Sequence, residues 1–148
     1  MPAIAPLTLS ADPRYDDPKD DRASQFPPSV LLLLNQARQK LFDAECATRA
    51  IDRYAQAHLA ALRAAAAVLA ARARPRRRAQ PTSVWVLLAT VAPELAEWSA
   101  FFAATSATRA AAEAGVRRVV TDRDADDLVR QAGDFLTRAR RAAAKASP

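Results

Sequence analysis

The chain has 148 residues, enough for one domain with its own core, and 51% of them are hydrophobic, as in a globular protein. Its two glycines give little material for the turns of a sheet, whereas alanine, its commonest apolar residue, is the best helix former, so we expect an all-α fold. One cysteine and one histidine exclude an internal disulfide and an ordinary His/Cys zinc site.

Several other signatures are also missing from the sequence. The two glycines stand far apart, at Gly115 and Gly133, so there is no glycine-rich phosphate-binding loop. No stretch without charged residues reaches the roughly 20 residues that span a bilayer. The first residues lack the basic and apolar regions of a signal peptide, and a lone cysteine suits a reducing compartment. We therefore expect a cytoplasmic protein that uses no metal, cofactor or membrane.

Residues 1–28 are expected to form a disordered N-terminal tail. They include six prolines, five aspartates and few large apolar groups, so they cannot bury enough surface to offset the entropy lost on ordering. The aspartates outnumber the three basic residues there, which leaves the rest of the chain more basic than the overall charge of +6. We expect a helical bundle over residues 29–143 and a flexible C-terminus over 144–148.

The first two helices are predicted from hydrophobic periodicity. One runs from about Ser29, a plausible N-cap, to Thr48, with its apolar face widened near the start by residues 31–33. Its predicted buried positions are Val30, Leu34, Ala37, Leu41 and Ala44. The second runs from about residue 50 to 73, and its face of small side chains allows close helix packing. The short link predicts an antiparallel hairpin.

An arginine-rich segment follows the second helix. Its five arginines are Arg72, Arg74, Arg76, Arg77 and Arg78. Guanidinium groups beside a helix end favour a salt-sensitive, sequence-blind grip on phosphates. The alternative is a solvated loop whose arginines satisfy the carbonyl groups at the end of the helix.

The middle of the chain predicts a short apolar helix and a longer one. Thr82 or Ser83 can cap the short helix, which extends to about residue 91, and Pro93 marks a break. A helix then continues from Glu94 to about Glu113, and Gly115 suits its C-terminal cap. Four of its side chains are expected to face inward: Leu95, Trp98, Phe101 and Phe102.

The last helix has the clearest start signal. Thr121 and Asp124 have the spacing of a capping box. Its predicted buried stripe consists of Ala125, Leu128, Val129, Ala132, Phe135, Leu136 and Ala139. Basic residues gather near its C-terminal end, where the helix dipole favours them: Arg138, Arg140, Arg141 and Lys145. Together these elements predict an up-and-down bundle of four or five helices.

Extended segments of this sequence resemble the HEPN superfamily, helical bundles named for nucleotide binding in higher eukaryotes and prokaryotes. The segments are PPSVLLLLNQARQ, RYAQAHLAALRAAAAVLA, PTSVWVLLATVAPELAEWSAFFA and TDRDADDLVRQAGDFL, which together cover roughly residues 27–141. They look like the actinobacterial, SAV-type branch. This resemblance implies an HEPN-like bundle that forms homodimers.

The same resemblance implies a candidate catalytic pair. In HEPN ribonucleases an arginine is followed, after four to six residues, by a histidine that assists attack by the RNA 2′-hydroxyl, while the arginine stabilises the phosphate. Arg53 and His58 fit that spacing within RYAQAH. The alternative is that His58 lies at the edge of the core, hydrogen-bonded locally, and Arg53 is a solvated residue at a helix start.

Three functions stay open at this point. The first is a non-enzymatic HEPN module that binds RNA, a nucleotide or a partner protein. The second is a toxin-like, metal-independent ribonuclease that uses Arg53 and His58. The third is a structural helical adaptor that binds an acidic protein through its arginine-rich segment.

Overall fold

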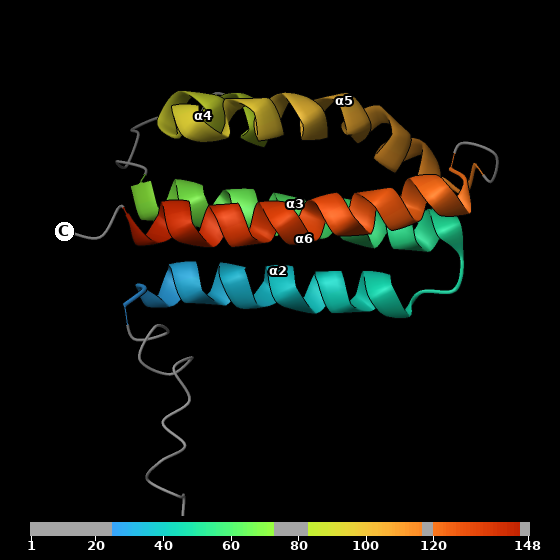
Figure 1. The fold of residues 1–148 in the computed structure, drawn as a ribbon, viewed down its shortest axis with the longest axis horizontal. Helices are drawn as coiled ribbons and strands as arrows, with labels where there is room; N and C mark the ends of the chain where they lie inside the picture. The colour runs from blue at the N-terminus through green and yellow to red at the C-terminus, as the bar shows by residue number, and fades with distance from the viewer. Residues whose placement is uncertain (1–24, 73–82, 117–119, 146–148) are drawn as a thin grey trace, which may run out of the picture.

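Helices make up nearly all of the computed structural model, which describes residues 25–72, 83–116 and 120–145 (Figure 1). They are α2 (Pro28–Cys46), α3 (Ala50–Arg72), α4 (Val84–Val91), the short 3-10 helix η1 (Pro93–Leu95), α5 (Ala96–Glu113) and α6 (Asp122–Ala144). No strand occurs in these described ranges, so the predicted all-α fold is confirmed.

The helices form an up-and-down bundle with α3 and α6 at its centre (Figure 1). α2 packs antiparallel against α3, which confirms the predicted hairpin, and α4 and α5 cover the opposite side of the central pair. α3 and α6 run in the same direction. Arg53 at the start of α3 pairs with Asp122 at the start of α6, and Arg72 at the end of α3 bonds to Ala142 at the end of α6.

The size of the buried side chains matches the spacing of the helices. Cα atoms of α3 come within 8 Å of those of both α2 and α6, whereas α5 scarcely comes that close to α6. The close contacts are lined by alanines of α3: Ala57, Ala60, Ala61, Ala64, Ala65 and Ala67. The wider space between α5 and α6 is filled by aromatic rings. The ring centroids of Phe102 and Phe135, for example, lie 5.1 Å apart. Small residues thus set the close packing and aromatic ones complete the core.

Three predicted caps are present. The Ser83 hydroxyl accepts a hydrogen bond from the backbone N–H of Trp85 at the start of α4. Thr121 and Asp124 form a reciprocal capping box at the start of α6. Gly115, beyond the end of α5, has φ of 83°, a left-handed conformation that glycine adopts without steric cost.

The start of the bundle differs from the prediction. α2 begins one residue before Ser29, with Pro27 at the N-cap and no side-chain cap, because proline suits the first helical turn, where no N–H partner is needed. Phe26, expected in the tail, is buried and packs against Val30 and Leu34. The rest of the predicted tail, residues 1–24, lies outside the described residues.

Two expected core residues are exposed. Leu32, in the segment expected to widen the buried face of α2, is 57% exposed because it stands two positions from both Val30 and Leu34, about 200° around the helix. Phe101 is 38% exposed, whereas Phe102, the next residue, is fully buried. No helix within the described ranges is long and apolar enough to cross a bilayer.

Candidate functional site

Arg53, the first residue of the candidate catalytic pair, holds three parts of the bundle together. Its Nη1 donates to the carbonyl oxygens of Ala47 and Thr48, at 3.3 and 2.8 Å, in the turn between α2 and α3. Its Nη2 lies 2.7 Å from Asp122 Oδ1. Its Nε lies 3.2 Å from Asp126 Oδ1, which makes an ion pair but, because of its geometry, no hydrogen bond. The side chain is only 14% exposed, so Arg53 is not the solvated residue of the alternative interpretation.

His58, the second residue of the pair, lies in the aromatic core and is 1% exposed. Its Nε2 is 3.1 Å from the carbonyl oxygen of Phe102, and because a carbonyl only accepts, Nε2 carries the proton. The ring makes edge contacts with Trp85 and Phe102, with centroids 5.9 Å away in both cases. Burial lowers the pKa of His58, partly opposed by the hydrogen bond to Phe102. The neutral imidazole is thus the form that fits this site.

The structure does not bring Arg53 and His58 together. Positions five apart on a helix differ by about 140° around its axis, and here one side chain faces the α2–α3 turn while the other enters the core. A general base must reach the proton that it removes. Within this chain, His58 would have to leave its aromatic surroundings, and Arg53 its acidic partners, to contact a phosphate.

Arg72 is the only residue of the arginine-rich segment within the described ranges. Its Nε and Nη2 donate to the carbonyl oxygen of Ala142, at 3.2 and 3.1 Å, and its Nη1 lies 3.5 Å from that of Val91. Nη2 also pairs with Glu94, and this ion pair lowers the pKa of the Glu94 carboxyl. Arg72 therefore satisfies helix-end carbonyls. Arg74, Arg76, Arg77 and Arg78 lie outside the described residues.

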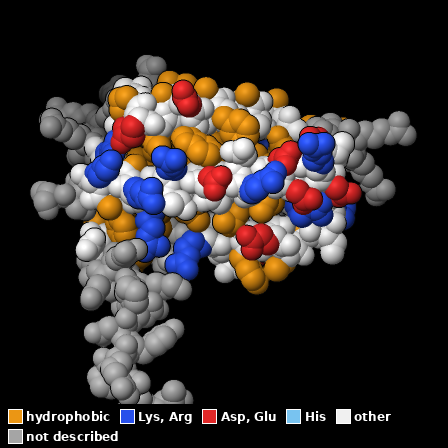
Figure 2. All heavy atoms as spheres, viewed as in Figure 1, with side chains coloured by type: hydrophobic (Ala, Val, Ile, Leu, Met, Phe, Trp, Pro, Cys, Tyr) orange, Lys and Arg blue, Asp and Glu red, His pale blue; other side chains and the backbone are white. Residues whose placement is uncertain are grey.

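A group of basic side chains that form no ion pair within the described residues covers the C-terminal part of α6 and the adjoining part of α2. We call it the basic patch, and it consists of Arg38, Arg138, Arg140, Arg141 and Lys145. Figure 2 shows Lys and Arg side chains gathered over this end of the molecule. Arg140 also lies over the ring of Phe26, 5.8 Å from its centroid. The sequence predicted the basic end of α6. It did not predict that Arg38 belongs to the same patch, because Arg38 lies on α2, which is far from α6 along the chain.

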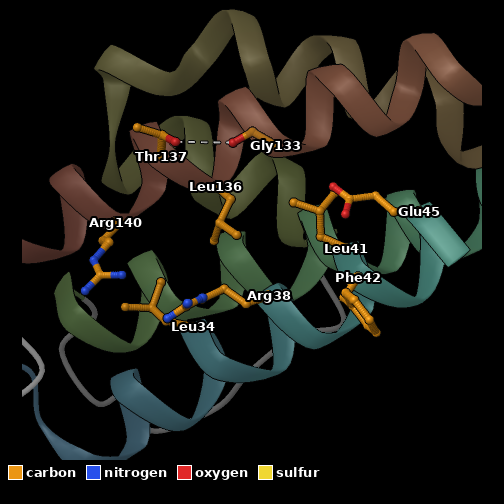
Figure 3. Close-up of a pocket in the computed structure, with 9 residues that line it drawn as sticks. All are labelled: Leu34, Arg38, Leu41, Phe42, Glu45, Gly133, Leu136, Thr137 and Arg140. Carbon is orange, nitrogen blue, oxygen red and sulfur yellow. Dashed lines mark hydrogen bonds between the residues drawn. The ribbon is translucent and has the colours of Figure 1, made fainter. Parts of the chain in front are cut away.

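A groove of about 400 Å³ runs between α2 and α6, and we call it the α2–α6 groove (Figure 3). It is lined by Leu34, Arg38, Leu41, Phe42, Glu45, Gly133, Leu136, Thr137 and Arg140. Most of its lining is apolar, and Phe42 at its rim is 59% exposed. Arg38 and Arg140 belong to both the groove and the basic patch. The signal in the sequence was an interior glycine in an otherwise alanine-rich helix.

A second, more polar hollow of about 570 Å³ lies between α5 and the start of α6. Tyr54 of α3 lines it, together with Thr105 and Thr108 of α5. Burial raises the pKa of Tyr54, while hydrogen bonds to the two threonines oppose that effect. Its acidic residues already have partners, since Asp124 caps α6 and Asp127 pairs with Arg130.

The comparisons with known proteins identify the family. A family model described as SAV_6107-like HEPN matches residues 44–140, about two thirds of the chain. No curated protein and no solved structure matches the chain significantly. The matched range begins near the end of α2 and reaches Arg140 in α6, so it includes the central helix pair and its aromatic core. The chain therefore belongs to the HEPN superfamily, in its SAV_6107-like branch.

Proposed function

We propose that this protein is a non-catalytic HEPN module that binds RNA by its phosphate groups. The observation that carries the proposal is the basic patch, in which the four arginines have no acidic partner among the described residues and Lys145, although it lowers the pKa of Glu94, forms no ion pair there. Unpaired cations on one face attract a polyanion, and they contact the backbone without reading the sequence. Arginine, which forms four of the five, presents a fork of donors that matches phosphate oxygens.

The burial of His58 argues against cleavage by the candidate pair. A metal-independent ribonuclease would need His58 near the RNA 2′-hydroxyl, but the ring is 1% exposed and bonded to Phe102. Arg53 would need to face a phosphate, but it is paired with Asp122. The basic patch, in contrast, lies at the surface and is available without rearrangement.

Fluorescence anisotropy with a labelled single-stranded RNA of about 20 nucleotides tests the proposal. Affinity should fall steeply between about 50 and 200 mM salt, because each phosphate contact on a single strand contributes about −0.7 to the slope of log K against log salt. Arg138→Ala/Arg141→Ala should weaken binding about fivefold or more and flatten that slope by about one unit.

A matched variant separates the basic patch from net charge. Arg63→Ala/Arg123→Ala also removes two arginines that have no partner among the described residues, but they lie outside the patch, on α3 and in the first turn of α6. We expect this variant to bind RNA almost as well as the wild type. Equal losses in the two double variants would show unlocalised attraction, and affinity that ignores salt would refute the proposal.

An acidic protein is the other polyanion that could occupy the basic patch, as the adaptor hypothesis supposes. RNA is favoured because the cations form an extended surface over two helices rather than a single paired site. The same anisotropy assay separates the two ligands when unlabelled polyglutamate competes against RNA. Unlabelled RNA should displace the labelled RNA at a much lower concentration than polyglutamate of equal charge does.

A further inference from the structure

We propose that the α2–α6 groove is a docking site for an amphipathic helix of a partner protein, with apolar side chains along one face and carboxylates toward one end. This proposal does not depend on RNA binding. It rests on the shape of the groove, on Gly133 in its floor, and on the charges at its two ends.

The shape of the groove suits a rod-like ligand. Its α2 residues run from Leu34 to Glu45 at intervals of one helical turn, so they line about 16 Å of the helix. Its α6 residues run from Gly133 to Arg140, through about two turns of a neighbouring helix. A trough of this length matches about 11 residues of an α-helix, which would present anchors at i, i+3 or i+4, and i+7.

Gly133 leaves the floor of the groove open. Its presence destabilises α6 relative to an alanine, and packing within the chain gives no reason for this loss of stability. An interior glycine destabilises a helix relative to alanine, which this chain uses throughout its helices. A Cβ at position 133 would meet only Leu41 Cδ2, at 3.7 Å, which is an ordinary contact. Nothing inside the chain therefore requires a glycine here. A glycine does let the backbone of another helix approach α6 closely.

The apolar surface of the groove has no cover within the described chain. Leu41 and Leu136 form its floor, and Phe42 projects at its rim with 59% of its surface exposed (Figure 3). Aromatic side chains, phenylalanine among them, are enriched in protein–protein interfaces relative to the rest of the surface. Leu32 on the same helix is equally exposed but lies outside the groove, which makes it a matched control.

Charge selects the kind of helix that fits. Arg38 and Arg140 stand at one end of the groove and Glu45 at the other (Figure 3). Neither arginine pairs with a carboxylate in the described residues. A partner that brings Asp or Glu to that end would therefore form ion pairs with them. The negative end of the helix dipole adds to this preference, and it orients the C-terminus of the docked helix toward Arg38 and Arg140.

The probe for the test is a synthetic, end-capped, fluorescent peptide of about 15 residues. It carries leucines at alternating three- and four-residue spacing and glutamates in its last turn, and a scrambled peptide of the same composition is the control. The full chain should bind the amphipathic peptide at least about tenfold more tightly than the scrambled one, measured by anisotropy. Equal affinity for the two peptides would overturn the proposal.

Variants of the groove locate the binding. Gly133→Leu fills the floor and Phe42→Ala removes the rim, and each should weaken peptide binding about tenfold, whereas Leu32→Ala should not. Phe42→Ala keeps the test valid if Gly133→Leu fails to fold, because Phe42 is largely exposed. Gly133→Ala should raise the thermal midpoint by about 2 °C and still weaken peptide binding, since packing tolerates the methyl group but the ligand loses its closest approach.

Two further readouts separate this proposal from other occupants. RNA binding should persist in Gly133→Leu, so a loss of both activities would show that the groove belongs to the RNA site. Sedimentation should show the same oligomeric state for the wild type and for Phe42→Ala. A dimer that only the wild type forms would mean that a second copy, and not a partner helix, occupies the groove.

Discussion

Arg53 Nη2 lies 2.7 Å from Oδ1 of Asp122, which is 69 residues later in the chain. This ion pair joins the first turn of α3 to the first turn of α6, and Arg72 repeats the connection at the opposite ends of the same two helices through the carbonyl oxygen of Ala142. The two arginines therefore hold the parallel central helices in register at both ends. The Arg-x4-His motif includes one of these structural contacts.

Replacement of Arg53 should weaken the fold. Arg53→Ala removes two ion pairs and two hydrogen bonds to the α2–α3 turn, but both aspartates are well exposed, so we expect a loss of only about 1–2 kcal/mol. Urea unfolding followed by circular dichroism measures this change. Arg49→Ala is the control, because the ion pair of Arg49 with Asp52 is exposed and local to one helix. Equal stabilities of the two variants would contradict the structural role of Arg53.

The sequence was sufficient to predict the bundle because local signals agree with one another. Periodicity, the Thr121 capping box and the breaks at Pro93 and Gly115 all recur in the structure. The prediction of buried residues was wrong at Leu32 and Phe101, because a run of adjacent apolar residues does not show which of them faces outward.

The candidate site was harder to predict than the fold. The family resemblance and a matching spacing linked Arg53 with His58, but the contacts that decide their roles come from residues far away in the chain, Asp122 and Phe102. The α2–α6 groove likewise depends on which face of α2 meets α6. Such pairings follow from tertiary packing, and no local pattern in the sequence specifies them.

The stability of the protein should depend on pH through His58. Burial lowers its pKa in the folded state below the ordinary value of about 6.5. The unfolded chain then binds more protons than the folded one, so the contribution of His58 to stability is complete above pH about 6.5 and declines as the pH falls below it. His58→Gln keeps an N–H that can donate to Phe102 but does not titrate. The urea midpoint of the wild type should therefore fall more between pH 7.5 and 5.5 than that of His58→Gln, and parallel curves would contradict this prediction.

Wild-type protein should leave RNA intact. His58 is sequestered and Arg53 is paired, so no group of the candidate pair is positioned to act on a 2′-hydroxyl or a phosphate. The measurement is prolonged incubation of labelled RNA with purified protein in the presence of a chelator. Cleavage that disappears in both His58→Ala and His58→Gln, with the fold of the latter verified by circular dichroism, would instead support the ribonuclease hypothesis.

The homodimer implied by the family resemblance remains a prediction, and the outer face of α4 and α5 is the surface on which we would place it. Val86 of α4 is exposed there, and α5 adds four exposed alanines with no charge between them: Ala100, Ala103, Ala104 and Ala107. Phe101, 38% exposed, lies at the edge of this face, where it also lines the hollow between α5 and α6. Alanines allow close helix packing between subunits as they do within the bundle, and a two-fold axis would pair this face with its own copy. Sedimentation should show a concentration-dependent dimer that Phe101→Glu dissociates and Leu32→Glu, on the opposite side of the bundle, leaves unchanged. A dimer that persists in Phe101→Glu would place the interface elsewhere.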